Sequence, residues 1–168
     1  MADVKGKAAP KSTRPDREIE RLVEFLAQAY NRKSWHGVNL RGSLRLVDHK
    51  MALWKMKNLK HSIWELAVHA TYWKYAVWRK ITGAKIGLFP FKGSDWFAIE
   101  DVSPKAWKRD LHLLDDYHEK LVTAVGELRP SRLGKEWDNL EPKIIGVAYH
   151  DIYHAGQIQL LKKLYKKK

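Results

Sequence analysis

Cysteine is absent from the 168-residue chain, and this absence excludes several kinds of site. Without a thiol the chain forms no disulfide, holds no iron–sulfur cluster or Cys-type zinc finger, and offers no thiolate nucleophile. The absence also fits a reducing cytosol, so we expect a cytoplasmic protein. Long apolar runs are missing too, since none approaches the roughly 18 residues of a membrane span. The first 15 residues lack an apolar core, so we expect no secretory signal.

Acidic residues are scarce relative to basic ones. The chain has 32 Lys and Arg against 19 Asp and Glu, which gives a net charge of +13. Residues 1–17 carry a net charge of +3 and residues 162–168 a net charge of +5, so much of the excess lies near the two ends. We interpret these ends as solubilising segments. The alternative is that they bind nucleic acid or another anionic surface non-specifically.

The length of the chain suits one domain, and its 45% of hydrophobic residues excludes a disordered chain. Residues 1–15 are rich in Lys, Ala and Pro, and we expect a disordered basic tail there. Residues 166–168 are all lysine and form a second basic tail. The predicted domain therefore covers residues 16–165.

Two long helices have clear start and stop signals. Ser62 and Glu65 form an S-x-x-E capping box, which predicts a helix from Ser62 to Gly83. Ser103 is a good N-cap, and Pro104 suits the first helical position, so another helix begins there. Leucines at helical spacing continue this second pattern to about residue 125.

Two more helices complete the prediction. One begins at Asp16 as its N-cap and carries a helical apolar stripe to Tyr30; the last begins near Glu141 and runs to about Tyr165. Residues 34–60 are less regular and predict loop with one or two short helical turns. No alternating strand pattern competes with these helices. We therefore expect an all-α fold, a four-helix bundle with a long crossover connection over residues 83–103.

The last predicted helix contains two histidines four residues apart, His150 and His154. This spacing places both imidazoles on one helical face, where they can bind one metal ion. Both lie on the apolar side of the helix, and His69 lies on the apolar side of the helix that starts at Ser62. Burying three imidazoles is costly unless each has a partner, and a shared metal ion provides one. The pattern predicts a metal site formed by His69, His150 and His154.

Alternative interpretations remain open for the three histidines and for the residues near them. The three histidines could instead be hydrogen-bonded core residues without a metal. Glu65 could act as a fourth ligand or a base, although its capping role already explains it. Gln157 could orient a ligand or lie at the partly exposed end of the bundle. Tyr149 and Tyr153 either donate hydrogen bonds to the groups around the metal or serve as packing residues. The remaining histidines are expected on the surface or in loops: His36, His49, His61, His112 and His118.

Two segments resemble the DinB-like family of metalloenzymes. They are HSIWELAVHATYWKYAV at residues 61–77 and YHDIYHAGQIQLLKKL at residues 149–164, and SWHGVNL at 34–40 and DWF at 95–97 are similar to one branch of that family. The resemblance covers most of residues 16–165. It implies a four-helix bundle that binds a divalent metal, often nickel or zinc, through His69, His150 and His154. It also implies that homodimers are common. The role of His36 in the WHG segment stays undecided.

The family resemblance also suggests a reaction class. Relatives include thiol-dependent S-transferases and a maleylpyruvate isomerase, so the expected function is a metal-dependent enzyme that activates a low-molecular-weight thiol or water for attack on a small electrophilic substrate. A second hypothesis is a non-enzymatic basic bundle that binds nucleic acid or a protein partner. A third is a structural bundle whose histidines only fill the core.

Overall fold

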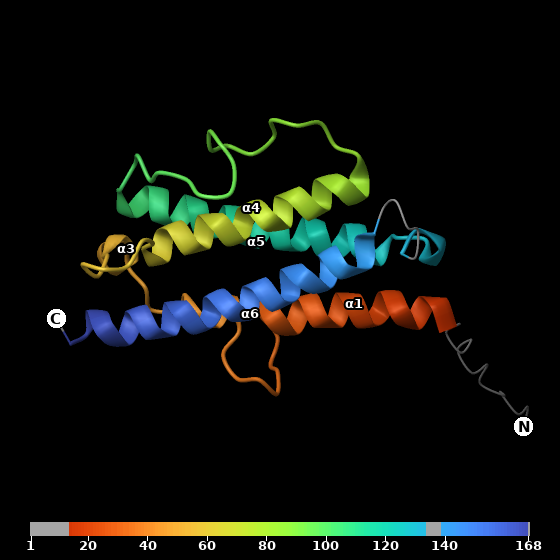
Figure 1. Cartoon of the computed structure of the whole chain (residues 1–168), viewed down its shortest axis with the longest axis horizontal. Helices are drawn as coiled ribbons and strands as arrows, with labels where there is room; N and C mark the ends of the chain where they lie inside the picture. The colour runs from red at the N-terminus through yellow and green to blue at the C-terminus, as the bar shows by residue number, and fades with distance from the viewer. Residues whose placement is uncertain (1–13, 134–138, 168) are drawn as a thin grey trace, which may run out of the picture.

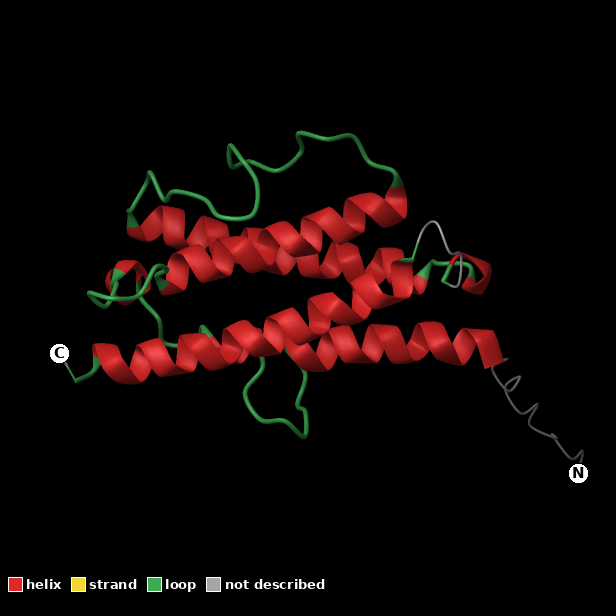
Figure 2. Cartoon of the chain, in the orientation of Figure 1, coloured by secondary structure: helices red, strands yellow, loops and turns green. Residues whose placement is uncertain are grey.

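The computed structural model describes residues 14–133 and 139–167 of the chain. Within these residues all regular elements are helical and no strand is present (Figure 2). This confirms the predicted all-α class. The described helices include none that is both long and apolar enough to cross a membrane. The elements are α1 (Arg14–Tyr30), α2 (Leu40–Ser43), α3 (His49–Leu53), α4 (Ile63–Thr82), α5 (Pro104–Gly126), the 3-10 turn η1 (Pro130–Arg132) and α6 (Leu140–Tyr165).

The four long helices, α1, α4, α5 and α6, pack lengthwise against one another (Figure 1). α4 contacts α5 and α6, and α1 contacts the same two helices. The short helix α2 packs on α6, and α3 packs on α4. Residues 84–102, which we call the crossover segment, return along the outside of α4 to the start of α5 (Figure 1). As a result α4 and α5 begin at the end of the molecule where α6 ends.

The predicted boundaries of α4 and α5 are confirmed. The Ser62 side chain accepts a hydrogen bond from the Glu65 backbone N–H, and the Glu65 carboxylate accepts one from the Ser62 N–H. Gly83 ends α4 with φ of 72°, a left-handed conformation that glycine adopts without steric cost. Ser103 caps α5, and Pro104 occupies its first turn. These signals act within a few residues, so the sequence alone locates them.

The start of α1 differs from the prediction. The helix begins at Arg14, so Asp16 lies inside its first turn and is not the N-cap. An acidic side chain is favourable in either position because both place it near the positive end of the helix dipole. Of the predicted tail over residues 1–15, residues 1–13 lie outside the described residues, and the last two belong to α1. α6 begins at Leu140, one residue before the expected start.

Two short helices lie in the irregular segment between α1 and α4, as predicted. Asn39 caps α2 by accepting from the Gly42 N–H, and Asp48 caps α3 by accepting from the Met51 N–H. Each cap satisfies a backbone donor that such a short helix would otherwise leave free. The segment therefore has a defined path along α4 and α6.

The apolar core is divided into two clusters along the length of the molecule. On α6, Ile144 and Val147 belong to one cluster, and Ile158 and Leu161 belong to the other. The other long helices show the same division. On α4, the buried apolar side chains among residues 63–70 belong to the cluster of Ile158 and Leu161, and Val77 and Ile81 belong to the cluster of Ile144 and Val147. Polar side chains occupy the interval between the clusters.

This interval is a buried polar layer formed by Lys74, His118 and Asp151. Lys74 and Asp151 are completely buried and form an ion pair. The Lys74 ammonium lies 4.9 Å from the centre of the Tyr30 ring, and His118 stacks on the same ring at 3.9 Å. Burial and the nearby Lys74 lower the pKa of His118 to about 3, so its imidazole is neutral. The prediction that His118 is a surface or loop residue is therefore wrong.

Candidate metal centre

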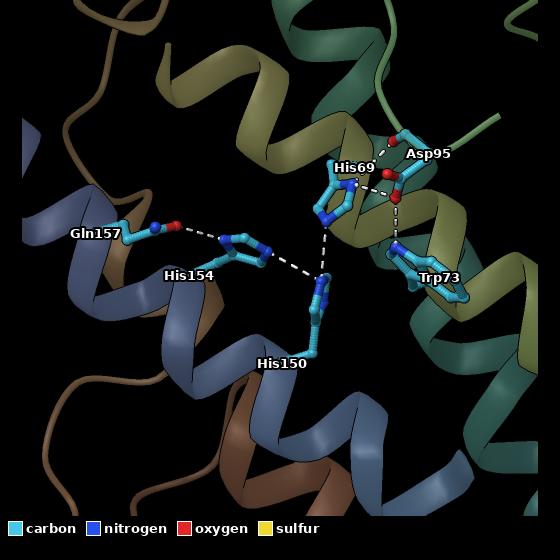
Figure 3. A network of polar contacts seen from close by, with 6 residues as sticks. All are labelled: His69, Trp73, Asp95, His150, His154 and Gln157. Atoms are coloured by element: carbon cyan, nitrogen blue, oxygen red, sulfur yellow. Dashed lines mark hydrogen bonds and ion pairs between the residues drawn. The ribbon is translucent and has the colours of Figure 1, made fainter. Parts of the chain in front are cut away.

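The structure brings His69, His150 and His154 together between α4 and α6 (Figure 3). The Nε2 atom of His150 lies 3.0 Å from Nε2 of His69 and 2.9 Å from Nε2 of His154. One nitrogen of each ring lies within 4.8 Å of the corresponding nitrogens of the other two. These three side chains form a group that could hold one metal ion.

Local helix geometry and helix packing each contribute to this arrangement. His150 and His154 are one turn apart on α6, so their rings lie on the same face of one rigid element. α4 packs against α6 and presents His69 to that face. His69 is 5% exposed and His154 3% exposed, whereas His150 is half-buried. The cluster therefore has one side that reaches the surface, at His150.

The ring nitrogens that point away from the cluster fix two of the three tautomers. Nδ1–H of His69 donates to the backbone carbonyl of Asp95 at 2.8 Å, and Nδ1–H of His154 donates to Oε1 of Gln157 at 2.6 Å (Figure 3). A proton on Nδ1 leaves a lone pair on Nε2 of a neutral imidazole. Both of these lone pairs point toward Nε2 of His150.

The third imidazole cannot satisfy both lone pairs. A proton on Nε2 of His150 can be donated to His69 or to His154 but not fully to both, and its Nδ1 then remains a buried acceptor without a partner. A proton on Nδ1 leaves three lone pairs facing one another. A cation among the three Nε2 atoms removes this conflict, because it accepts all three lone pairs. The donor set therefore fits a transition-metal ion better than it fits a hydrogen-bonded core.

The electrostatic environment keeps the three rings neutral. Burial, together with the neighbouring rings of His154 and His69, lowers the pKa of His150 to about 3. Burial also lowers the pKa of His154 to about 4, although the bond to Gln157 opposes this shift. The pKa of His69 is lowered by burial and partly restored by Asp95. Neutral imidazoles are the form that binds metal ions, so no proton has to leave at neutral pH.

The crossover segment supplies contacts that the sequence did not predict. Asp95 holds His69 through its carbonyl and places its carboxylate 3.2 Å from the same Nδ1 atom. The indole N–H of Trp73 donates to this carboxylate at 3.0 Å. The Trp96 ring stacks on His69 at 3.8 Å with an interplanar angle of 2°. The DWF tripeptide thus positions His69 and covers one face of its ring.

His61 belongs to the same stack. Its ring lies 3.5 Å from that of Trp96 with an interplanar angle of 10°, so Trp96 is held between His61 and His69. His61 is half-buried, and burial lowers its pKa. The prediction placed it among surface or loop residues because it falls outside the apolar stripe of α4. Only the path of the crossover segment shows its connection to the centre.

The other candidate residues from the sequence lie outside the histidine cluster. Glu65 is engaged in the capping box and in an ion pair with Lys55 at 2.8 Å, which agrees with its capping role. Tyr149 and Tyr153 are 68% and 63% exposed, so neither is a buried packing residue. His36 lines a pocket of about 240 Å³ between α1 and α6 and is not a member of the histidine cluster.

Asp95 provides a test of how His69 is positioned. Its φ of 68° is in the left-handed region, where glycine is unstrained. We expect Asp95→Gly to keep the backbone carbonyl bond and the fold, but to weaken metal affinity about 10-fold because the carboxylate near Nδ1 is lost. Competition with a metal chelator measures this affinity, and Asp101→Gly, an exposed aspartate of the same segment, is the control. Equal affinities of all three proteins would contradict the role of the Asp95 carboxylate.

Comparison with family models, with curated proteins and with solved structures finds no match to this chain.

Proposed function

We propose that this protein is a DinB-like four-helix-bundle metalloenzyme. In this proposal His69, His150 and His154 hold one divalent transition-metal ion, and the substrate is a small electrophilic molecule. The reaction is transfer of a thiol or hydrolysis by water. The observation that carries the proposal is that the Nε2 atoms of three neutral imidazoles converge on one point. A metal ion there would accept a lone pair from each ring.

The protein side chains would have distinct roles at such a site. A divalent metal lowers the pKa of a thiol or water that it binds, so that the anion forms near neutral pH. Asp95 and Gln157 hold the imidazoles of His69 and His154 in fixed orientations. Trp96 excludes water from one face of His69.

The exposed side of the centre is aromatic. The Trp73 ring lies 6.3 Å from that of His150 and is 39% exposed, and the Tyr153 ring lies 5.2 Å from that of His154. Aromatic rings at the edge of a site offer apolar surface to the organic part of a substrate. Three imidazoles suit both nickel and zinc. The sequence resemblance supports these metals, a low-molecular-weight thiol as co-substrate, and a homodimer.

Elemental mass spectrometry of the untagged protein tests the proposal. We expect about one equivalent of nickel or zinc per chain, or uptake of one equivalent after exposure to either ion. The reconstituted protein is then assayed with low-molecular-weight thiols and electrophiles, and with activated esters. Turnover that disappears after chelation and returns with metal supports the enzyme. Absence of metal after exposure to both ions would contradict the site, and bound metal without turnover in either assay would contradict the reaction class.

A further inference from the structure

At the end of the molecule where α6 finishes, the last turns of α6 contact the segment between α1 and α4, which is far away in the sequence. Figure 1 shows α3, part of this segment, at the same end as the C-terminus. Lys162 joins the two parts, since its Nζ donates to the carbonyls of Ser43 at 2.8 Å and Arg45 at 2.7 Å. The rings of Trp54 and Tyr165 are also in contact there, with centroids 5.7 Å apart. We call this surface the basic end. The cationic residues of its two segments, residues 44–61 and 158–167, are Arg45, Lys50, Lys55, Lys57, Lys60, Lys162, Lys163, Lys166 and Lys167.

Carboxylates do not balance this charge. Asp48 is the only acidic residue in residues 44–61 and 158–167, and its side chain caps α3. Lys55 pairs with Glu65, which lies on α4. Among the described residues the other cations of the basic end form no ion pair with a carboxylate. The surface therefore has a strong positive potential that attracts an anionic partner.

Exposed aliphatic side chains lie in the same segment. Leu46 is 87% exposed, Met56 42% and Leu59 43%. Leu46 also has φ of 61°, a left-handed conformation that is unfavourable for leucine. A leucine that is both strained and exposed indicates a binding role.

The turn that carries Leu46 is held on both sides. On one side of Leu46, Lys162 of α6 donates a hydrogen bond to the carbonyl of Arg45. On the other side, the Trp107 indole of α5 donates one to the carbonyl of Val47 at 2.9 Å. Two long helices thus fix a turn whose central side chain points to solvent. Such preorganisation lowers the entropy cost of binding.

We propose that the basic end docks on an anionic phospholipid surface. The lysines would contact the charged headgroups, and Leu46, Met56 and Leu59 would enter the boundary between headgroups and acyl chains. Eight of the nine cations are lysine, and these three apolar side chains are aliphatic. Nucleic-acid surfaces instead use arginine for bidentate contacts and exposed aromatic rings for base stacking. The aromatic rings at this end, Trp54 and Tyr165, are half-buried and in contact with each other, so the composition favours lipid. This docking is independent of the metal centre and of its reaction.

Vesicle sedimentation with the full chain tests the proposal. We expect the protein to sediment with phosphatidylcholine vesicles that contain phosphatidylserine, to be released by added salt, and to remain in solution with pure phosphatidylcholine. Equal binding to the two vesicle types, or no binding to either, would overturn the proposal. A fluorescent single-stranded oligonucleotide is measured in parallel, and binding to it in place of the anionic vesicles would show a nucleic-acid surface and overturn the lipid assignment.

Paired charge reversals show whether the basic end or the overall charge is responsible. Lys57→Glu with Lys60→Glu is expected to weaken binding to the anionic vesicles by at least about 20-fold, since each lysine near such a surface contributes about five-fold. Lys80→Glu with Lys85→Glu changes the net charge equally at the opposite end of α4 and is expected to weaken binding by less than about three-fold. Equal losses in the two variants would contradict the proposal.

Leu46→Asn tests the apolar contact separately from charge. Asparagine tolerates the left-handed conformation better than leucine, so the free energy of unfolding should not fall. We expect binding to the anionic vesicles to weaken at least about five-fold because one aliphatic side chain no longer enters the lipid. Unchanged vesicle binding by this folded variant would show that Leu46 makes no lipid contact and would overturn the insertion of this turn.

Discussion

Replacing His154 with Ala is expected to abolish stoichiometric metal binding. The change removes one of three Nε2 lone pairs and leaves His69 and His150, whose Nε2 atoms are 3.0 Å apart, as the remaining imidazoles. Metal content of the desalted variant, measured by elemental mass spectrometry, should fall from about one equivalent to near zero. Bound metal should also stabilise the native protein by about 4 kcal/mol when free metal is about 1,000 times Kd, which raises Tm by roughly 8 to 16 °C. This increase should be absent in His154→Ala.

The matched control is His112→Ala, which removes an exposed histidine of α5 outside the cluster. This variant should keep its metal and show the same increase in Tm as the unmodified protein. Circular dichroism confirms that both variants are helical before metal is measured. Full metal content in helical His154→Ala would remove this residue from the ligand set. Loss of metal in both variants would show that the loss is not specific to the histidine cluster and would leave the ligand assignment contradicted by its control.

Asp151→Ala is expected to lower the free energy of unfolding by about 3 to 5 kcal/mol. Lys74 and Asp151 are both completely buried, so removal of the carboxylate leaves the ammonium in the core without its partner. The nearby Tyr30 ring, 4.9 Å from Nζ, offers only a cation–π contact in compensation. Urea unfolding followed by circular dichroism measures the change.

A double variant distinguishes loss of the ion pair from general damage to the core. Lys74→Met combined with Asp151→Leu replaces the pair by apolar side chains and should recover most of the lost stability. The double variant also keeps the test informative if Asp151→Ala does not fold. A single variant that loses less than about 1 kcal/mol, or a double variant less stable than the single one, would contradict the importance of the buried pair.

Local signals in the sequence predicted the helices well. The capping box at Ser62, the glycine after α4 and the Ser103–Pro104 pair each act through contacts within a few residues, so their outcome does not depend on the rest of the chain. The prediction of Asp16 as the N-cap of α1 was wrong, because an aspartate is favourable both at the N-cap and in the first turn of a helix. A sequence pattern that fits two neighbouring positions cannot choose between them.

The site was predicted in part. The spacing of His150 and His154 follows from the period of the helix, and the apolar face of α4 indicated His69. Asp95, Trp96 and His61 could not be found in this way, because the crossover segment has no periodicity that relates it to α4. The resemblance to the DinB-like family includes the DWF tripeptide but indicates no role for it. Its contacts depend on where the crossover segment lies.

By itself, the sequence determined the helical class, the limits of α4 and α5 and the alignment of two histidines on α6, since these depend on interactions between near neighbours in the chain. Only the tertiary structure decided that His118 is buried, that Lys74 pairs with Asp151, and that Lys162 of α6 binds the backbone carbonyl of Arg45. These contacts join residues far apart in the chain. They arise when helices bury their apolar faces together, and that packing brings polar and charged groups into contact that no local pattern relates.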